Sequence, residues 1–193
     1  MEETSTTTKL NETLKSLEET MDELKELGYP IGRVRSIYGE LYTAKKLIDL
    51  QPQVGRDREY TRADIYLSKI CKLVEVKSCE KNKMTENATW VWTFGEKQIT
   101  KFDYAVLIGF GENSFDIEKV FVLSHNELEG WPVRKDNVRK KGTVYISYYD
   151  NFEDYEKDVE EDVKKGVKNA EIEIEKELNK YSEKFENRWD KIR

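Results

Sequence analysis

The spacing of apolar residues changes abruptly at Pro52, from steps of three and four to short runs and alternations. A chain that contains both patterns is expected to fold into a mixed α/β structure. Before the change, apolar residues recur at helical spacing over residues 9–27 and again over residues 33–50. We therefore expect two amphipathic helices at the start of the chain, with Ile37 on the buried face of the second.

Beyond Pro52 the chain has the short apolar segments, bounded by turn residues, that are typical of β-strands. We expect strands at residues 53–60, 63–67, 70–78, 90–94, 104–110, 119–123 and 143–149. The continuous apolar run 104–110 indicates a strand buried on both faces. A short helix is expected at residues 96–101, and another begins at Ser124. These elements predict an α/β fold in which helices flank a mixed sheet.

Helical spacing returns in the carboxy-terminal segment, where apolar residues recur at steps of three and four from Val159 to Trp189. This predicts a long amphipathic helix. We expect residues 1–152 to form one domain that includes the amino-terminal helix. Residues 153–193 would form a helical extension that packs on the domain or on a partner subunit. The two amphipathic end helices would then provide the surfaces of a homodimer.

Composition argues against several classes of protein. No segment reaches the roughly 18 consecutive apolar residues that a membrane helix needs, and the first residues do not resemble a signal peptide, so we expect a cytoplasmic protein with no membrane partner. Two cysteines make no disulfide framework, and we expect Cys71 to be a small core residue. The sequence Gly109-Phe110-Gly111 lacks the third glycine of a dinucleotide site, so no organic cofactor is expected.

The net charge of −6 is unevenly distributed along the chain. Residues 30–100 contain 13 Lys and Arg against 9 Asp and Glu, which is an excess of +4, whereas both ends are acidic. This basic centre is compatible with a phosphate-bearing partner and equally with a solvated charged surface.

Within the expected strand 70–78, the apolar run 73–77 is interrupted by two charged residues, Glu75 and Lys77. Because side chains alternate along a strand, these two point to one face while Val76 points to the other, into the core. Asp64 begins the preceding strand, so a tight turn would bring two acids and a lysine together. The alternative is that Glu75 and Lys77 simply face solvent on a half-exposed strand.

Asp64 and the Glu75-Val76-Lys77 triplet, with Glu40 on the preceding helix, resemble the motif of the PD-(D/E)xK nuclease superfamily, which includes many restriction endonucleases. The order helix, three strands, helix, strand is also similar, and the resemblance covers residues 33–110. It implies a restriction-endonuclease-like fold with a mixed sheet core.

Two further positions bear on the resemblance. Gln98 is similar to the glutamine of the Q-h-x-x-Y motif in the RecB-like branch, with Phe102 in place of the tyrosine. Ala63 stands where the superfamily has the proline of its name. Both departures weaken the assignment to a branch more than the assignment to the superfamily.

The resemblance implies a metal-dependent DNA endonuclease, of restriction or defence type, that uses Mg²⁺, with Mn²⁺ as a substitute. Asp64, Glu75 and the backbone carbonyl of Val76 would hold the metal, since hard oxygen ligands suit this ion. Glu40 would bind metal-coordinated water or a second metal. Such an ion neutralises the phosphate and generates the attacking hydroxide near neutral pH.

The remaining catalytic roles fall to Lys77 and Gln98. By the resemblance, Lys77 would orient or deprotonate the attacking water and offset the charge that builds on the phosphorane. Gln98 would position Lys77 or the DNA backbone, although the same residue could equally be an ordinary helix-surface glutamine.

DNA is the expected partner, and candidate contacts to it are basic residues outside the catalytic set: Arg33, Arg35, Arg62, Arg134, Lys135, Arg139 and Lys140. The last four lie on an expected loop before the final strand. Trp90, Trp92 and Phe94 would either stack on bases or pack in the core. A Holliday-junction or other structure-specific nuclease, a non-catalytic nucleic-acid-binding protein with the same fold, and an α/β scaffold with an accidental motif remain alternatives.

Overall fold

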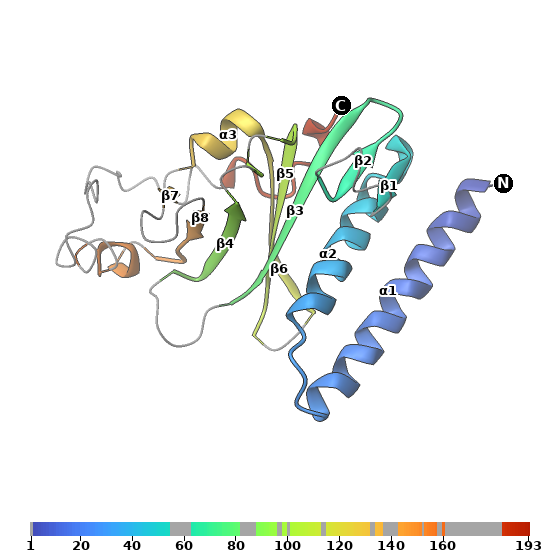
Figure 1. Cartoon of the computed structure of the whole chain (residues 1–193), viewed down its shortest axis with the longest axis horizontal. Helices are drawn as coiled ribbons and strands as arrows, with labels where there is room; N and C mark the ends of the chain where they lie inside the picture. Colours follow the sequence, from blue (N-terminus) through green and yellow to red (C-terminus); the bar gives the residue numbers. More distant parts are fainter. Residues whose placement is uncertain are drawn as a thin grey trace.

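A five-stranded mixed sheet forms the centre of the protein in the computed structural model (Figure 1). Its strands, in spatial order, are β1 (Pro52–Val54), β2 (Ile65–Leu67), β3 (Lys72–Glu80), β5 (Tyr104–Phe110) and β6 (Ile117–Ser124). The central pair β3 and β5 is parallel, and the other neighbours are antiparallel. The structure describes residues 2–54, 63–81, 88–95, 98–99, 101–112, 115–131, 134–136, 143–151, 153–157, 160 and 183–193.

A second, three-stranded antiparallel sheet lies beside the first and consists, in spatial order, of β4 (Trp90–Gly95), β8 (Thr143–Tyr148) and β7 (Arg134–Asp136). Figure 1 shows four layers in sequence: α1 (Glu2–Glu26), α2 (Gly32–Lys46), the five-stranded sheet and the three-stranded sheet. The short helix α3 (His125–Glu129) follows β6. Two 3₁₀ helices, η1 (Ile48–Leu50) and η2 (Trp189–Lys191), complete the described elements. The mixed α/β fold class expected from the sequence is confirmed, while residues 55–60 of the first expected strand lie outside the described residues.

The helix α1 ends where Gly28 adopts a left-handed conformation, with φ of 76°. Tyr29 donates its N–H to the Leu24 carbonyl at 2.9 Å, and Gly28 donates to the Lys25 carbonyl at 2.9 Å. These two bonds form the Schellman arrangement, which satisfies carbonyls that the end of a helix would otherwise leave unpaired. The chain then reverses and starts α2 at Gly32.

The helix α2 packs on the central sheet through a buried face that combines the large residues Arg35 and Tyr38 with small ones. A Cβ at Gly39 would overlap the Ser78 hydroxyl and lie 3.2 Å from Ile108, so only glycine permits this close approach. The buried face of α2 includes Gly39 and Ala44. Ile37, which the helical spacing places on that face, is instead 46% exposed. The prediction is wrong because the close contact of Gly39 with the sheet fixes the rotation of the helix about its axis, and Ile37 then faces solvent.

Two clusters of buried residues form the core, one on each face of the central sheet. The cluster between the two sheets contains Trp90, Trp92 and Phe94, each at most 1% exposed. Trp92 donates its indole N–H to the Ile108 carbonyl at 3.0 Å, which satisfies the one polar atom of that ring. These aromatic residues are therefore core residues, and none of them is free to stack on a nucleic-acid base.

The described end of the chain lies against β6. Val122 donates to the Phe185 carbonyl and Asn187 donates to the Val120 carbonyl, both at 2.9 Å. Phe185 is 6% exposed and belongs to the core between the sheets. The prediction that one helix runs through Phe185 to Trp189 is wrong, because residues 184–188 are turns and a bridge and Asn187 has φ of 53°. Residues 161–182 of the expected helix lie outside the described residues.

Three local predictions also need correction. Cys71 is exposed, because the connection between β2 and β3 is a four-residue turn that places Cys71 at φ of 54°. The described residues of the expected helix 96–101 are not helical, since residues 98 and 99 form a turn and residue 101 a bend. Arg134 and Lys135 belong to strand β7, since they pair with β8, and not to a loop. Within the part of the chain that the structure describes, no helix combines the length and the apolar character needed to cross a membrane.

Candidate active site

Glu75 and Lys77 lie on the face of β3 that points toward the three-stranded sheet. The Lys77 Nζ is 2.5 Å from Glu75 Oε1, which confirms that the two side chains share one face. The same ammonium lies 5.5 Å from the centre of the Phe94 ring, a distance at which a cation is attracted to an aromatic face. The alternating residue Val76 is 6% exposed and packs in the core on the opposite face.

Asp64 reaches this strand from the position just before β2. Its Oδ2 accepts a hydrogen bond from the backbone N–H of Val76 at 2.8 Å. The ladder between β2 and β3 begins one residue later, where Ile65 pairs with Val74. The antiparallel hairpin therefore brings the Asp64 carboxylate to the Glu75-Val76-Lys77 sequence, as its position in the expected hairpin predicted.

Glu75 is fully buried, at 0% exposure, and this environment changes its acidity. Burial raises the pKa of Glu75 to about 7, Lys77 opposes this increase, and the nearby Asp64 carboxylate adds to it. The second oxygen of Glu75, Oε2, is buried with no hydrogen-bond partner among the described residues. The site thus contains a carboxylate oxygen that is held away from water without a donor.

Gln98 reaches Glu75 from a turn that follows β4. Its Nε2 donates to Glu75 Oε1, the same oxygen that contacts Lys77. The turn is held by bonds from the Gln98 and Ile99 amides to the Gly95 carbonyl, at 2.8 and 3.0 Å. Gln98 therefore positions the glutamate directly, whereas the family resemblance assigned it to Lys77 or the DNA backbone.

Phe102 stands where the resemblance calls for a tyrosine. It is 7% exposed and packs against Phe94 at 5.9 Å and His125 at 5.8 Å between ring centres. Since Phe94 in turn lies under the Lys77 ammonium, Phe102 supports the site through packing.

Glu40 lies on α2, the helix that covers the other face of β3. Its neighbour Gly39 sits against Val76 and Ser78, which point away from Glu75. Glu40 is half-buried there. The structure therefore brings Asp64, Glu75, Lys77 and Gln98 together and places Glu40 beside the opposite side of the strand.

The donor set fits a hard divalent cation with few protein ligands. Among the described residues, no three His, Cys, Asp or Glu side chains lie close enough together to hold a metal ion. Mg²⁺ is often bound by only one or two carboxylates together with several waters. The pair Asp64 and Glu75 supplies two, and the unpartnered Oε2 of Glu75 offers a lone pair that no protein donor uses within the described part of the chain.

The basic residues expected to contact DNA have different surroundings. Arg33 is exposed on α2. Arg35 is 4% exposed and its Nη1 donates to Glu80 Oε2 at 2.6 Å, so it is not part of an open surface. Arg134 and Lys135 are on β7, and Arg62, Arg139 and Lys140 lie outside the described residues.

Sequence reasoning missed one contributor to the site, Phe94 beneath Lys77. The alternation of Trp90, Trp92 and Phe94 predicts a strand with one buried face. It does not indicate which strand that face packs against, so the contact between Phe94 and Lys77 could not be predicted. Neither a search against protein-family models nor a search of curated proteins finds a match to this chain.

Proposed function

We propose that this protein is a metal-dependent endonuclease with a restriction-endonuclease-like fold that hydrolyses phosphodiester bonds in DNA. The observation that carries the proposal is the buried Glu75, which contacts Lys77 and Gln98 through one oxygen and leaves the other without a partner among the described residues. A buried carboxylate oxygen without a donor is costly, and a bound cation removes that cost.

In the proposal, Asp64, Glu75 and the backbone carbonyl of Val76 hold Mg²⁺, and Mn²⁺ can replace it. Glu40, on the helix that covers the other face of β3, is not among these ligands. When bound, the ion neutralises negative charge on the phosphate and lowers the pKa of the attacking water. Gln98 holds the Glu75 carboxylate in place by its hydrogen bond.

Lys77 is the residue proposed to act on the attacking water. Its ammonium lies beside Glu75 and over the Phe94 ring, so its position is fixed by two contacts. A donor held at this point orients a water molecule and offsets the negative charge of the phosphorane as it forms. In this proposal the protein acts on DNA in the cytoplasm as a restriction or defence enzyme, and a homodimer would supply the two active sites needed to cut both strands.

Cleavage of plasmid and long linear DNA with Mg²⁺, Mn²⁺ or EDTA tests this proposal. We expect cutting that EDTA abolishes and that Lys77→Ala lowers by at least about 100-fold, the lower end of general acid–base contributions. Lys72→Ala is the matched control, because Lys72 lies on the same strand but pairs with Asp103.

A four-way junction, single-stranded DNA and RNA are included as further substrates. Cutting of a junction alone would assign the protein to the structure-specific nucleases. If no substrate is cut, or if Lys77→Ala cuts like the wild type, the proposed catalytic role is wrong. Retained DNA binding without cutting would then indicate a binding protein.

A further inference from the structure

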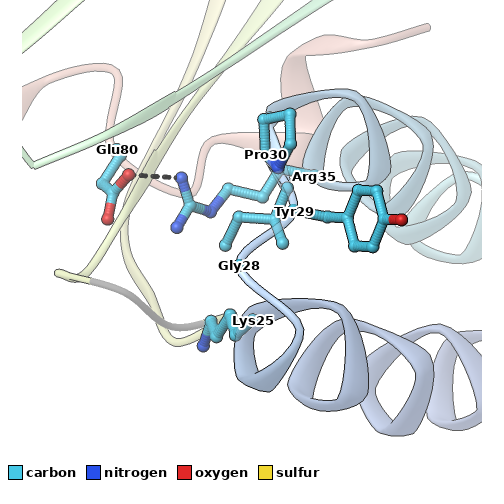
Figure 2. A pocket seen from close by; sticks show the side chains of 8 residues that line it. Lys25, Gly28, Tyr29, Pro30, Arg35 and Glu80 are labelled. Carbon is cyan, nitrogen blue, oxygen red and sulfur yellow. Dashed lines mark hydrogen bonds and ion pairs between the residues drawn. The ribbon is translucent and has the colours of Figure 1, made fainter.

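A pocket of about 630 Å³ lies at the junction of α1 and α2, on the face of β3 opposite the candidate active site. Figure 2 shows Arg35 and Glu80 on one side of it and Lys25, from the last turn of α1, across from them. The loop residues Gly28 to Gly32 complete the lining. The proposed nuclease chemistry uses none of these residues.

Arg35 is the distinctive side chain of this pocket. It is 4% exposed, and its Nη1 is held by Glu80 at 2.6 Å. The Nε and Nη2 atoms are buried and have no hydrogen-bond partner among the described residues. Nε and Nη2 form one edge of the guanidinium, the edge that binds both oxygens of a carboxylate or phosphate. Buried donors without acceptors are rare in proteins and call for an explanation.

The amino terminus of α2 lies at the same pocket. Ile31 is its N-cap and makes no side-chain capping bond, and the first turn contains no acidic residue. The first amide groups of a helix have no partner within it and carry partial positive charge, so this 15-residue helix presents donors where Gly32 lines the pocket.

The charges around the pocket favour an anion. Of the described residues that line the pocket, Lys25 and Arg35 are positively charged and Glu80 is negatively charged. Lys25 also pairs with Asp22 at 3.5 Å. The carbonyl end of α1, which would repel an anion, is closed by the bonds from Gly28 and Tyr29.

We propose that this pocket is a binding site for a phosphate group, carried by inorganic phosphate or by a small organic phosphate. Arg35 offers its unpartnered Nε and Nη2 edge, and the first amides of α2 and the Lys25 ammonium are further donors among the residues that line the pocket. A tetrahedral phosphate accepts from all three, whereas a planar carboxylate has only two oxygens to share.

Calorimetric titration of the metal-free protein in EDTA tests the site with inorganic phosphate and adenosine 5′-monophosphate. We expect saturable binding within about 10 mM ligand, a concentration that fills even a site with a Kd near 1 mM. Tighter binding of the monophosphate would show that an organic phosphate is the better ligand, and equal binding that the phosphate group alone is recognised. Adenosine, which lacks the phosphate, should not bind.

Two variants locate the binding. Arg35→Met removes the guanidinium group and with it the Nε and Nη2 donors, and should weaken phosphate binding at least tenfold. Because loss of the Glu80 pair could also disturb folding, Gly32→Glu is the second variant. A Cβ at Gly32 meets no atom within 4 Å, so the new carboxylate can enter the pocket and repel the ligand without displacing the helix.

Asn11→Asp, an exposed position on α1, adds the same charge elsewhere and should bind like the wild type. Lys77→Ala should also bind normally, because it alters the candidate active site and not the pocket. No saturable binding by the wild-type protein, or equal binding by Gly32→Glu, would overturn the proposal without affecting the proposed nuclease activity.

Discussion

The Asp64 carboxylate accepts a hydrogen bond from the backbone N–H of Val76, with 2.8 Å between Oδ2 and the nitrogen. Val76 stands between Glu75 and Lys77, so this single bond fixes the acid before β2 to the strand that carries the other two site residues. The hydrogen bond from Val76 gives Asp64 a structural role, and the negative charge of its carboxylate gives it a proposed metal-binding role. A substitution that keeps the hydrogen bond but removes the charge can separate these two roles.

Asp64→Asn should separate them, because the oxygen of the new side-chain amide still accepts from Val76 while the charge is lost. We expect the melting temperature at pH 8 to be equal or slightly higher, since the repulsion of Glu75 is removed, and Mg²⁺ binding to weaken at least tenfold. Asp64→Ala also loses the bond and should lower the free energy of unfolding by about 1 kcal/mol. Thermal unfolding and Mg²⁺ calorimetry check both results, and Asp64 is not a ligand if the Asp64→Asn variant binds Mg²⁺ normally.

The raised pKa of Glu75 predicts a pH-dependent stability. Below its ordinary pKa of 4.5 the group is protonated in both the folded and unfolded states, and no penalty arises. Between 4.5 and about 7 the unfolded chain releases the proton while the folded protein keeps it, so the free energy of unfolding falls as pH rises. Glu75→Gln should remove this decline, and its advantage over the wild type should grow up to pH 7 and then level off.

Urea unfolding at pH 5, 6, 7 and 8 measures the effect, and Glu127→Gln is the opposite control. Burial acts to raise the pKa of Glu127, but its bonds to Lys191 and Ser124 outweigh burial and lower that pKa. Both the ordinary pKa of 4.5 and the lowered pKa of Glu127 lie below this pH range, so Glu127→Gln should be less stable than the wild type by a nearly constant amount from pH 5 to 8. Saturating Mg²⁺ at pH 8 should stabilise the wild type and not Glu75→Gln. A flat difference for Glu75→Gln across this range would contradict the burial argument.

The local pattern of apolar and polar residues predicted those parts of the fold that are determined by residues close together in the sequence. The continuous apolar run 104–110 became a strand buried on both faces, and the Ser124 to Glu127 sequence became a capped helix start. Glu75 and Lys77 were placed on one face by the period of two alone. In each case the determining interactions lie within a few residues.

The failures arise where a distant partner decides the outcome. The spacing of residues 33–50 could not show that Gly39 meets Ser78 and turns Ile37 outward, because that contact joins a helix to a strand. The sequence of β4 predicted a strand but not its pairing with β8, which forms a second sheet. Similarly, Gln98 can contact Glu75 only because the three-stranded sheet holds the turn after β4 next to β3. The local sequence of that turn does not indicate this position.

Because Gly39 lies so close to Ser78, we expect substitutions at these two positions to have coupled effects on the free energy of unfolding. Gly39→Ala inserts a Cβ that overlaps the Ser78 hydroxyl, so we expect the free energy of unfolding to fall by about 1–3 kcal/mol, as overpacking usually costs. Ser78→Ala removes the overlapped oxygen and should recover part of this loss in the double variant. Urea unfolding of the four proteins gives the interaction energy. Additive effects would show that the helix accommodates the added methyl group in another way.

The conformation of Asn187 gives a test of how the chain ends. In a continuous helix through this position, Ala would be more stable than Gly by about 1 kcal/mol. In the structure Asn187 has φ of 53° and donates its N–H to the Val120 carbonyl, which fixes the residue in the left-handed region. Asparagine and glycine tolerate this region, whereas other residues are disfavoured there by roughly 1–2 kcal/mol. We therefore expect Asn187→Gly to have nearly wild-type stability and Asn187→Ala to be less stable by about 1 kcal/mol. Thermal or urea unfolding of the two variants tests this conformation. If a helix ran through residue 187, Asn187→Ala would instead be more stable than Asn187→Gly.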